Sequence, residues 1–195
     1  MGFGILFLGY FVGFIMFVGH LAILRVVSAL ATLFAAYKLS KYNVSFKPLI
    51  WISIASIAFY GVVSVFDILE YLNIISIEGT ATRSILSYPN IPMTFLFHAA
   101  LLYGIRKIAI DTDVPKITFA ATRNFIFHVI LLALELISIL PFTVTRNMFV
   151  LSVVVALILA VLNLILIFKC YANICDINDV DMEKRTRRKK GGKNN

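Results

Sequence analysis

The chain has 195 residues, of which 61% are hydrophobic and 14% are charged, and its mean hydropathy is +0.94. A soluble domain is about half apolar and about a quarter charged, so this composition excludes an ordinary soluble domain and predicts an integral membrane protein. The formal net charge of +8 is concentrated near the C-terminus, which indicates a topology and lipid signal rather than a nucleic-acid-binding surface.

The first apolar stretch, residues 2–39, is too long for a single span. As one helix it would measure about 57 Å, roughly twice the ~30 Å hydrocarbon core. Two interpretations remain open. The stretch forms either a hairpin of two short spans, about 2–18 and 21–38, turning at Gly19 and His20, or one span followed by a helix at the inner interface. An interfacial helix should carry a strongly charged face, whereas residues 21–37 carry only Arg25, which favours the hairpin.

The remaining apolar segments are clearer and predict four further spans. They cover about residues 49–70, 91–105, 124–140 and 148–168. The sequence therefore predicts an all-α, polytopic transmembrane helix bundle over residues 1–175, with six spans, or five if the first stretch contains one. Residues 176–195 are predicted to be a charged, disordered tail.

Basic residues predict how the bundle is threaded. The segments after Leu39, after Ile105 and after Phe168 are rich in Lys and Arg, whereas those after Glu70 and after Leu140 carry one Arg each. By the positive-inside rule the basic segments, and with them the C-terminus, are expected in the cytoplasm.

Two short segments resemble a family of uncharacterised small polytopic membrane proteins of low-GC bacteria. One is Leu39-Ser40-Lys41-Tyr42-Asn43 with Phe46, and the other runs through Cys170-Tyr171, Ile174-Cys175 and Asp181-Met182. The resemblance covers only this loop and the tail. It implies a bacterial plasma-membrane location and no particular activity.

Each predicted span has one polar or small-residue stripe on an otherwise apolar circumference. At 100° per residue, one stripe forms in each of four spans. They comprise Ser53, Ser56, Tyr60, Ser64 and Asp67; Thr94 and His98; Asn124, His128, Glu135 and Ser138; and Ser152, Ala156, Ala160 and Asn163. We expect the stripes to face inward and meet, with the last one packed against the helix that carries Glu135.

Ionisable groups inside spans are costly and are therefore functional candidates. The candidates are Glu135, His98, Asp67, His128, Asn163, Glu70 and His20. Glu135 is the foremost because it lies well inside its span without a flanking charge, and His98 is a plausible partner for it. The functional interpretation is a site for a cation or proton that opens outward, because carboxylate and imidazole bind metals and carry protons. The alternative is that these groups only bond the helices together.

Two functional hypotheses follow. The first is transport or permeation of a cation or proton, or a membrane subunit of a transporter. The second is a non-transporting accessory or sensor protein that acts through helix–helix contacts with another membrane protein or as a homo-oligomer. Because the sequence has no nucleotide-binding, hydrolase or metalloprotease motif, we expect no enzyme and no cofactor. A bis-histidine haem between His20 and His98 is a minor alternative, and any metal remains unassigned.

The basic tail predicts an additional contact with lipid. A basic residue near a membrane surface attracts anionic headgroups by ~1 kcal/mol. The residues expected to make this contact are Lys184, Arg185, Arg187, Arg188, Lys189 and Lys190. The simpler interpretation is that the tail only sets the topology.

Overall fold

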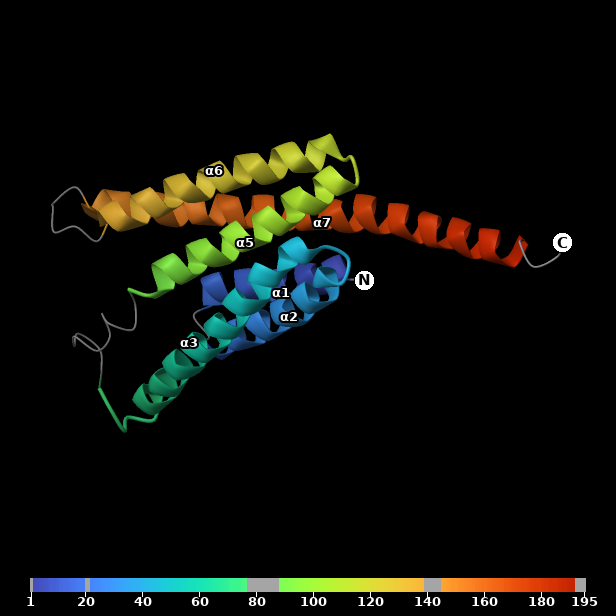
Figure 1. Ribbon diagram of the computed structural model, residues 1–195. Coiled ribbons are helices and arrows are strands. Elements are labelled where there is room, and N and C mark those ends of the chain that lie inside the picture. The colour runs from blue at the N-terminus through green and yellow to red at the C-terminus, as the bar shows by residue number, and fades with distance from the viewer. Residues whose placement is uncertain (1, 20–21, 77–87, 139–144, 192–195) are drawn as a thin grey trace.

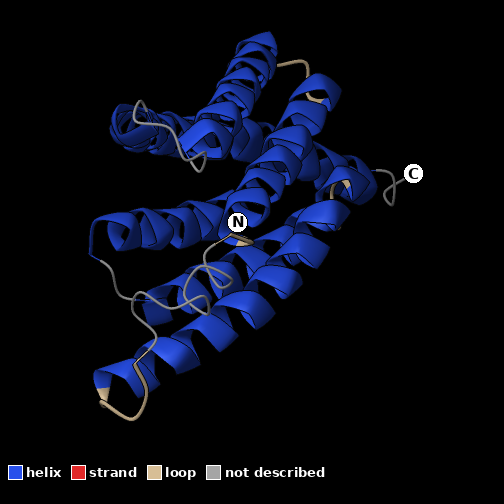
Figure 2. Ribbon diagram, turned by 90° about the vertical axis from the view of Figure 1, so that its left-hand side faces the viewer, coloured by secondary structure: helices blue, strands red, loops and turns tan. Residues whose placement is uncertain are grey.

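The computed structural model describes the backbone of residues 2–19, 22–76, 88–138 and 145–191, and the side chains of residues 2–15, 24–76, 88–138 and 148–174. The described chain is helical (Figures 1 and 2). Its elements are α1 (Gly2–Gly19), α2 (Ala22–Ser40), the 3-10 helix η1 (Val44–Phe46), α3 (Lys47–Tyr71), α5 (Asn90–Asp111), α6 (Pro115–Ser138) and α7 (Thr145–Gly191). The predicted all-α bundle is confirmed.

Helices α1 and α2 form an antiparallel hairpin, as the first interpretation of residues 2–39 predicted. Gly2 packs against Leu39, Gly9 against Thr32 and Gly13 against Ser28, so the two helices run in opposite directions along their length. The Ser28 hydroxyl donates a hydrogen bond of 2.7 Å to the Gly9 carbonyl. Since α2 also packs along α3, it is a member of the bundle and not a helix lying across its end.

The hairpin depends on the absence of a side chain at Gly9. A Cβ added there would lie 2.9 Å from the Ala31 Cβ and 3.2 Å from the Thr32 backbone nitrogen, and neither atom can rotate away. We expect Gly9→Val to lower the free energy of unfolding in detergent by about 1–3 kcal/mol, as overpacking does. The control is Gly61→Ala, because nothing lies within 4 Å of a Cβ at Gly61. Circular dichroism during heating measures both, and equal midpoints would contradict this packing.

The link between α5 and α6 is much shorter than predicted. The sequence suggested a loop over residues 106–123, yet α5 continues to Asp111 and α6 begins at Pro115. Apolar runs mark the part of a helix that lies in lipid, whereas the helix itself extends into water until a residue breaks it. Here Asp113 adopts a left-handed conformation with φ of 54°, and Pro115 suits a first helical turn.

Helix α7 also differs from the prediction. The sequence suggested a disordered tail from residue 176, whereas α7 is helical as far as Gly191 and projects beyond the bundle (Figure 1). Its last part has six Lys and Arg residues directly after Met182 and Glu183 and contains no glycine before residue 191. Glutamate, lysine, arginine and methionine have high intrinsic helix propensity, so the helix does not end where the apolar run ends.

One end of the bundle is basic, and the apolar core lies near it. The α2–η1 link, the α5–α6 turn and the start of α1 meet at this end, where the Asn43 amide donates a hydrogen bond of 2.6 Å to Asp111. Phe46 packs edge-on against Phe3 with ring centroids 6.1 Å apart. The largest fully buried side chains include Leu6, Leu49, Leu101, Leu102, Ile105, Leu166 and Ile167. The basic half of the bundle is therefore tightly closed.

The outer surface of the bundle is apolar along its helices. Many large hydrophobic side chains are at least two-fifths exposed, among them Leu8, Ile54, Val65, Phe127 and Ile158. Four described segments are long and apolar enough to cross a membrane, namely Val44–Tyr71, Asn90–Asp111, Pro115–Ser138 and Met148–Ile174, and Gly2–Ile15 is a shorter apolar helix. The chain is a multi-pass membrane protein whose surface requires a lipid bilayer.

Candidate functional site: a polar cavity between two groups of helices

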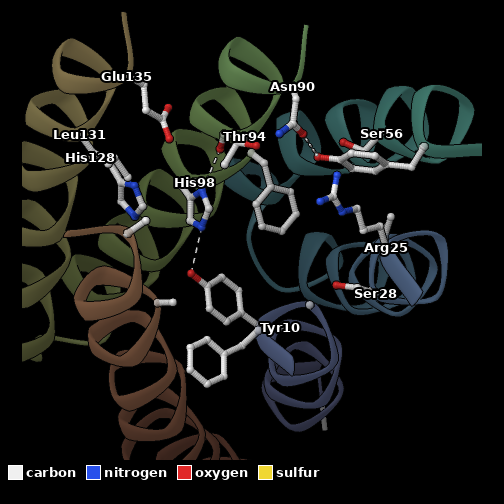
Figure 3. Close-up of a pocket in the computed structure, with 17 residues that line it drawn as sticks. Tyr10, Arg25, Ser28, Ser56, Asn90, Thr94, His98, His128, Leu131 and Glu135 are labelled. Atoms are coloured by element: carbon white, nitrogen blue, oxygen red, sulfur yellow. Dashed lines mark hydrogen bonds between the residues drawn. The ribbon is translucent and has the colours of Figure 1, made fainter. Parts of the chain in front are cut away.

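The polar stripes converge on a cavity of about 270 Å³. It lies between the first three helices, α1 to α3, and the last three, α5 to α7, and each of the six contributes to its wall (Figure 3). The lining residues Asn90, Thr94 and Glu135 come from the parts of α5 and α6 that are remote from the basic end. The cavity therefore occupies the half of the bundle opposite the apolar core.

A chain of hydrogen bonds ties four helices together, and we call it the floor because its members Tyr10, His98 and His128 line the cavity. The Arg123 guanidinium donates to the Asn124 Oδ1 at 3.1 Å, and the Asn124 Nδ2 donates to the Asn163 Oδ1 at 2.9 Å. The Asn163 Nδ2 then lies 3.0 Å from the Tyr10 hydroxyl and 2.8 Å from the His128 Nε2. Asn124, His128 and Asn163 are all buried. One amide on α7 thus joins α6 to α1.

The same chain continues from α1 into α5. The Tyr10 hydroxyl lies 2.9 Å from the His98 Nε2, and the His98 Nδ1 lies 2.8 Å from the Thr94 carbonyl oxygen. The rings of His98 and His128 stack, with centroids 4.2 Å apart and planes inclined by 22°. The floor is therefore held by α1, α5, α6 and α7 together.

Donor and acceptor chemistry assigns every proton in this chain. A guanidinium can only donate, so the Asn124 Oδ1 accepts, and both amides must then point as described. The Tyr10 hydroxyl accepts from Asn163 and gives its own proton to the His98 Nε2, while the His98 Nδ1–H donates to a carbonyl that can only accept. The His128 Nε2 likewise accepts. The hydrogen bonds of this chain are thus met with both imidazoles neutral.

Two charged side chains line the cavity from opposite sides. Arg25 of α2 lies with its guanidinium 5.6 Å from the centroid of the Tyr60 ring, and the Tyr60 hydroxyl donates to the Asn90 Oδ1 at 2.9 Å. Glu135 of α6 points inward from the other wall (Figure 3). Among the described residues its carboxylate has no hydrogen-bonding or ion-pairing partner given by the structure, whereas its backbone carbonyl accepts from Ser138.

The inward orientation of the polar stripes was predicted correctly. Ser53, Ser56, Ser64 and Ser152 are buried, and Ala156 and Ala160 line the cavity from α7. Asn163 bonds to the helix that carries Glu135, so the small-residue side of α7 packs where the sequence suggested. Helical periodicity was sufficient for these placements because each stripe is the sole polar side of its helix.

The predicted partner of Glu135 was wrong. His98 bonds to Tyr10 and to the Thr94 carbonyl, and both of its ring nitrogens are occupied, so it does not pair with Glu135. Asp67 and Glu70 are half-buried near the C-terminal end of α3. They are not among the residues that line the cavity. His20 and Lys184, Arg185, Arg187, Arg188, Lys189 and Lys190 lie outside the residues whose side chains are described.

Sequence reasoning missed Tyr10 and Arg25 as members of the site. Tyr10 is the single strongly polar side chain of an otherwise apolar helix, so no periodic stripe indicated which way it faces. Arg25 lies one turn from the start of α2, and from the sequence it was considered only as the single charge of residues 21–37. The available signal was that Tyr10 lies within Gly9-x-x-x-Gly13, because small residues mark the packed side of a membrane helix.

The described side chains contain no group of three or more His, Cys, Asp or Glu residues placed to hold a metal ion. For haem, a ligand must offer a free ring nitrogen, yet the His98 Nε2 already accepts from Tyr10 and its Nδ1 donates to Thr94. Binding haem through His98 would therefore require this part of the floor to break.

Comparisons with known proteins give no relative. No family model matches the chain, and neither a curated protein nor a solved structure is significantly similar to it.

Proposed function

We propose that this membrane protein binds a small polar solute in the cavity between its two groups of three helices and lets it pass through the bilayer. One observation carries the proposal: a polar cavity with a carboxylate and a guanidinium in its wall lies inside a bundle whose outer surface is apolar. Unpaired charge inside a membrane bundle is costly, and its usual reason is a solute or ion pathway.

The shape of the bundle supports a solute pathway that is closed at one end. The cavity occupies one half, and the apolar core seals the basic half. With the basic end in the cytoplasm, as its Lys and Arg residues indicate, this arrangement corresponds to a conformation closed on the inside. Passage then requires the two groups of helices to move relative to each other, in the manner of alternating access.

The hydrogen-bonded floor argues against a proton wire. Two of its links are amide side chains, Asn124 and Asn163, and an amide does not readily take up and release protons at neutral pH. We therefore replace the hypothesis of a cation or proton pathway, made from the sequence, with that of a pathway for a small polar solute. The role is non-enzymatic, and the resemblance of two short segments to bacterial membrane proteins supports a plasma-membrane location.

The second candidate is an accessory or sensor protein without transport. The observation that favours it is the satisfied chain from Arg123 to Thr94, because mutually paired polar groups bond helices together without needing a ligand. Contact of the basic end of α7 with anionic headgroups is compatible with both candidates.

Filling the cavity tests the proposal. Purified protein is reconstituted into liposomes, and solute entry is followed by light scattering with methylammonium, acetate, urea and glycine as test solutes. We expect at least one to enter faster than into empty liposomes and Ala160→Phe to abolish the difference, since Ala160 lines the cavity. Ala172→Phe, an exposed position on the same helix, is the control. Entry no faster than into empty liposomes for all four solutes would favour the accessory candidate.

A further inference from the structure

The two charges in the cavity wall are the starting point for identifying the solute. Arg25 projects from α2 and Glu135 from α6, so one charge belongs to each group of three helices (Figure 3). The lining of the same cavity also contains apolar side chains, among them Phe14, Phe97 and Leu131. Because charges interact more strongly where water is scarce, each will select strongly for the sign of its ligand.

The rest of the lining adds no further fixed charge. The hydrogen bonds of the floor fit His98 and His128 as neutral rings, and the other described lining residues are neutral. The cavity thus presents one positive and one negative group. A lone cation would be attracted by Glu135 and repelled by Arg25. A lone anion would be attracted by Arg25 and repelled by Glu135.

We propose that the cavity binds a small zwitterion, with its carboxylate on Arg25 and its ammonium group on Glu135. A guanidinium binds a carboxylate through two parallel hydrogen bonds, and a carboxylate accepts from an ammonium group, so each end of the solute meets its preferred partner. The apolar members of the lining suit a short uncharged carbon skeleton. This inference rests on the proposed function, because it names the solute of the same cavity.

The size of the cavity limits the solute to a small one. A volume of about 270 Å³ lies just below the range of about 300–1,000 Å³ that is typical of ligand pockets. It corresponds to roughly nine water molecules at about 30 Å³ each. Small amino acids therefore fit within this volume.

The position of the charges also suggests a use for the binding. Arg25 and Glu135 belong to different groups of helices, so a solute that touches both bridges the two groups. A solute with only one charge would form an ionic contact with only one of the two groups of helices. The zwitterion would thus favour approach of the two groups, which is the differential contact that a solute-driven conformational change requires.

Solute binding to the purified full-length protein in lipid nanodiscs tests the inference. The probes are glycine, β-alanine and γ-aminobutyrate, whose charges are progressively further apart, with ethylammonium and propionate as single-charge controls. Thermal stabilisation is measured as a function of probe concentration. We expect at least one zwitterion to bind about tenfold more tightly than either control, and Arg25→Gln and Glu135→Gln each to reduce that affinity about tenfold. Arg106→Gln and Asp113→Asn are matched controls outside the cavity.

The outcomes separate this inference from the proposed function. Equal or tighter binding of ethylammonium or propionate would overturn the zwitterion while leaving a solute-binding cavity in place. No stabilisation by any probe would overturn the inference, and the liposome measurement with Ala160→Phe then decides the proposed function independently. The comparison of probes uses the unaltered protein, so it remains decisive even if a variant fails to fold.

Discussion

Glu135→Gln is expected to reduce solute entry into liposomes to the rate of liposomes without protein. Glutamine keeps the size of the side chain and removes its charge. The carboxylate of Glu135 lines the cavity, so its loss removes the attraction for the positive end of the solute. Because the structure gives the carboxylate no bonded partner among the described residues, the bundle should fold and unfold as before. Circular dichroism during heating checks that second expectation.

The matched control for Glu135→Gln is Asp113→Asn. Asp113 lies in the α5–α6 turn at the basic end, away from the cavity, and adopts a left-handed conformation that asparagine also tolerates. Asp113→Asn therefore removes one negative charge, as Glu135→Gln does, but at a position that does not line the cavity. Solute entry should be unchanged. If Glu135→Gln folds normally and its solute entry matches that of the unaltered protein, Glu135 has no part in the pathway.

Asn163→Leu is expected to produce the largest loss of stability. Leucine branches at the same atom but cannot form hydrogen bonds, so the bonds to Tyr10, Asn124 and His128 at the centre of the bundle are lost. Interhelical hydrogen bonds in membranes contribute roughly 0.6 to 2 kcal/mol each, so the total is about 3 kcal/mol. For a chain of this size the thermal midpoint should fall by about 10 °C.

The control for Asn163→Leu lies ten residues further along the same helix. Asn173 is exposed, and among the described residues its amide bonds only to the Lys169 carbonyl of its own turn. Asn173→Leu should therefore change the thermal midpoint in detergent by no more than a degree or two. A similar midpoint for both variants would show that the chain of bonds through Asn163 does not hold α1, α6 and α7 together.

The corrections to the sequence prediction have one physical origin. Hydropathy responds to the lipid-exposed length of a helix, so it ended the predicted spans 91–105 and 148–168 where charge begins, whereas α5 continues past Arg106 and α7 past Lys169. The ammonium group of Lys107 lies over the Tyr103 ring, 5.9 Å from its centroid, so a basic side chain can pack along the helix that carries it. A helix end is decided by backbone geometry and breakers, not by charge.

Periodicity and composition determined which side of each helix faces inward. A membrane helix with one polar stripe has only one side that avoids lipid, so the orientations of Ser56, His98, Asn124 and Asn163 followed without knowledge of their neighbours. For the same reason Glu135 was found from sequence alone. The class of protein, its helices and its inward polar sides are properties of local chemistry.

Only the tertiary structure decided which inward groups meet. Tyr10 and His98 are 88 positions apart, and Tyr10 and Asn163 are 153 apart, so their bonds depend on how the helices pack and not on any local pattern. The same packing places Arg25 and Glu135 in the wall of one cavity. It also makes Tyr10, and not Glu135, the hydrogen-bonding partner of His98. Periodicity orients each helix about its own axis, but the depth and neighbours of a side chain depend on contacts with all the others.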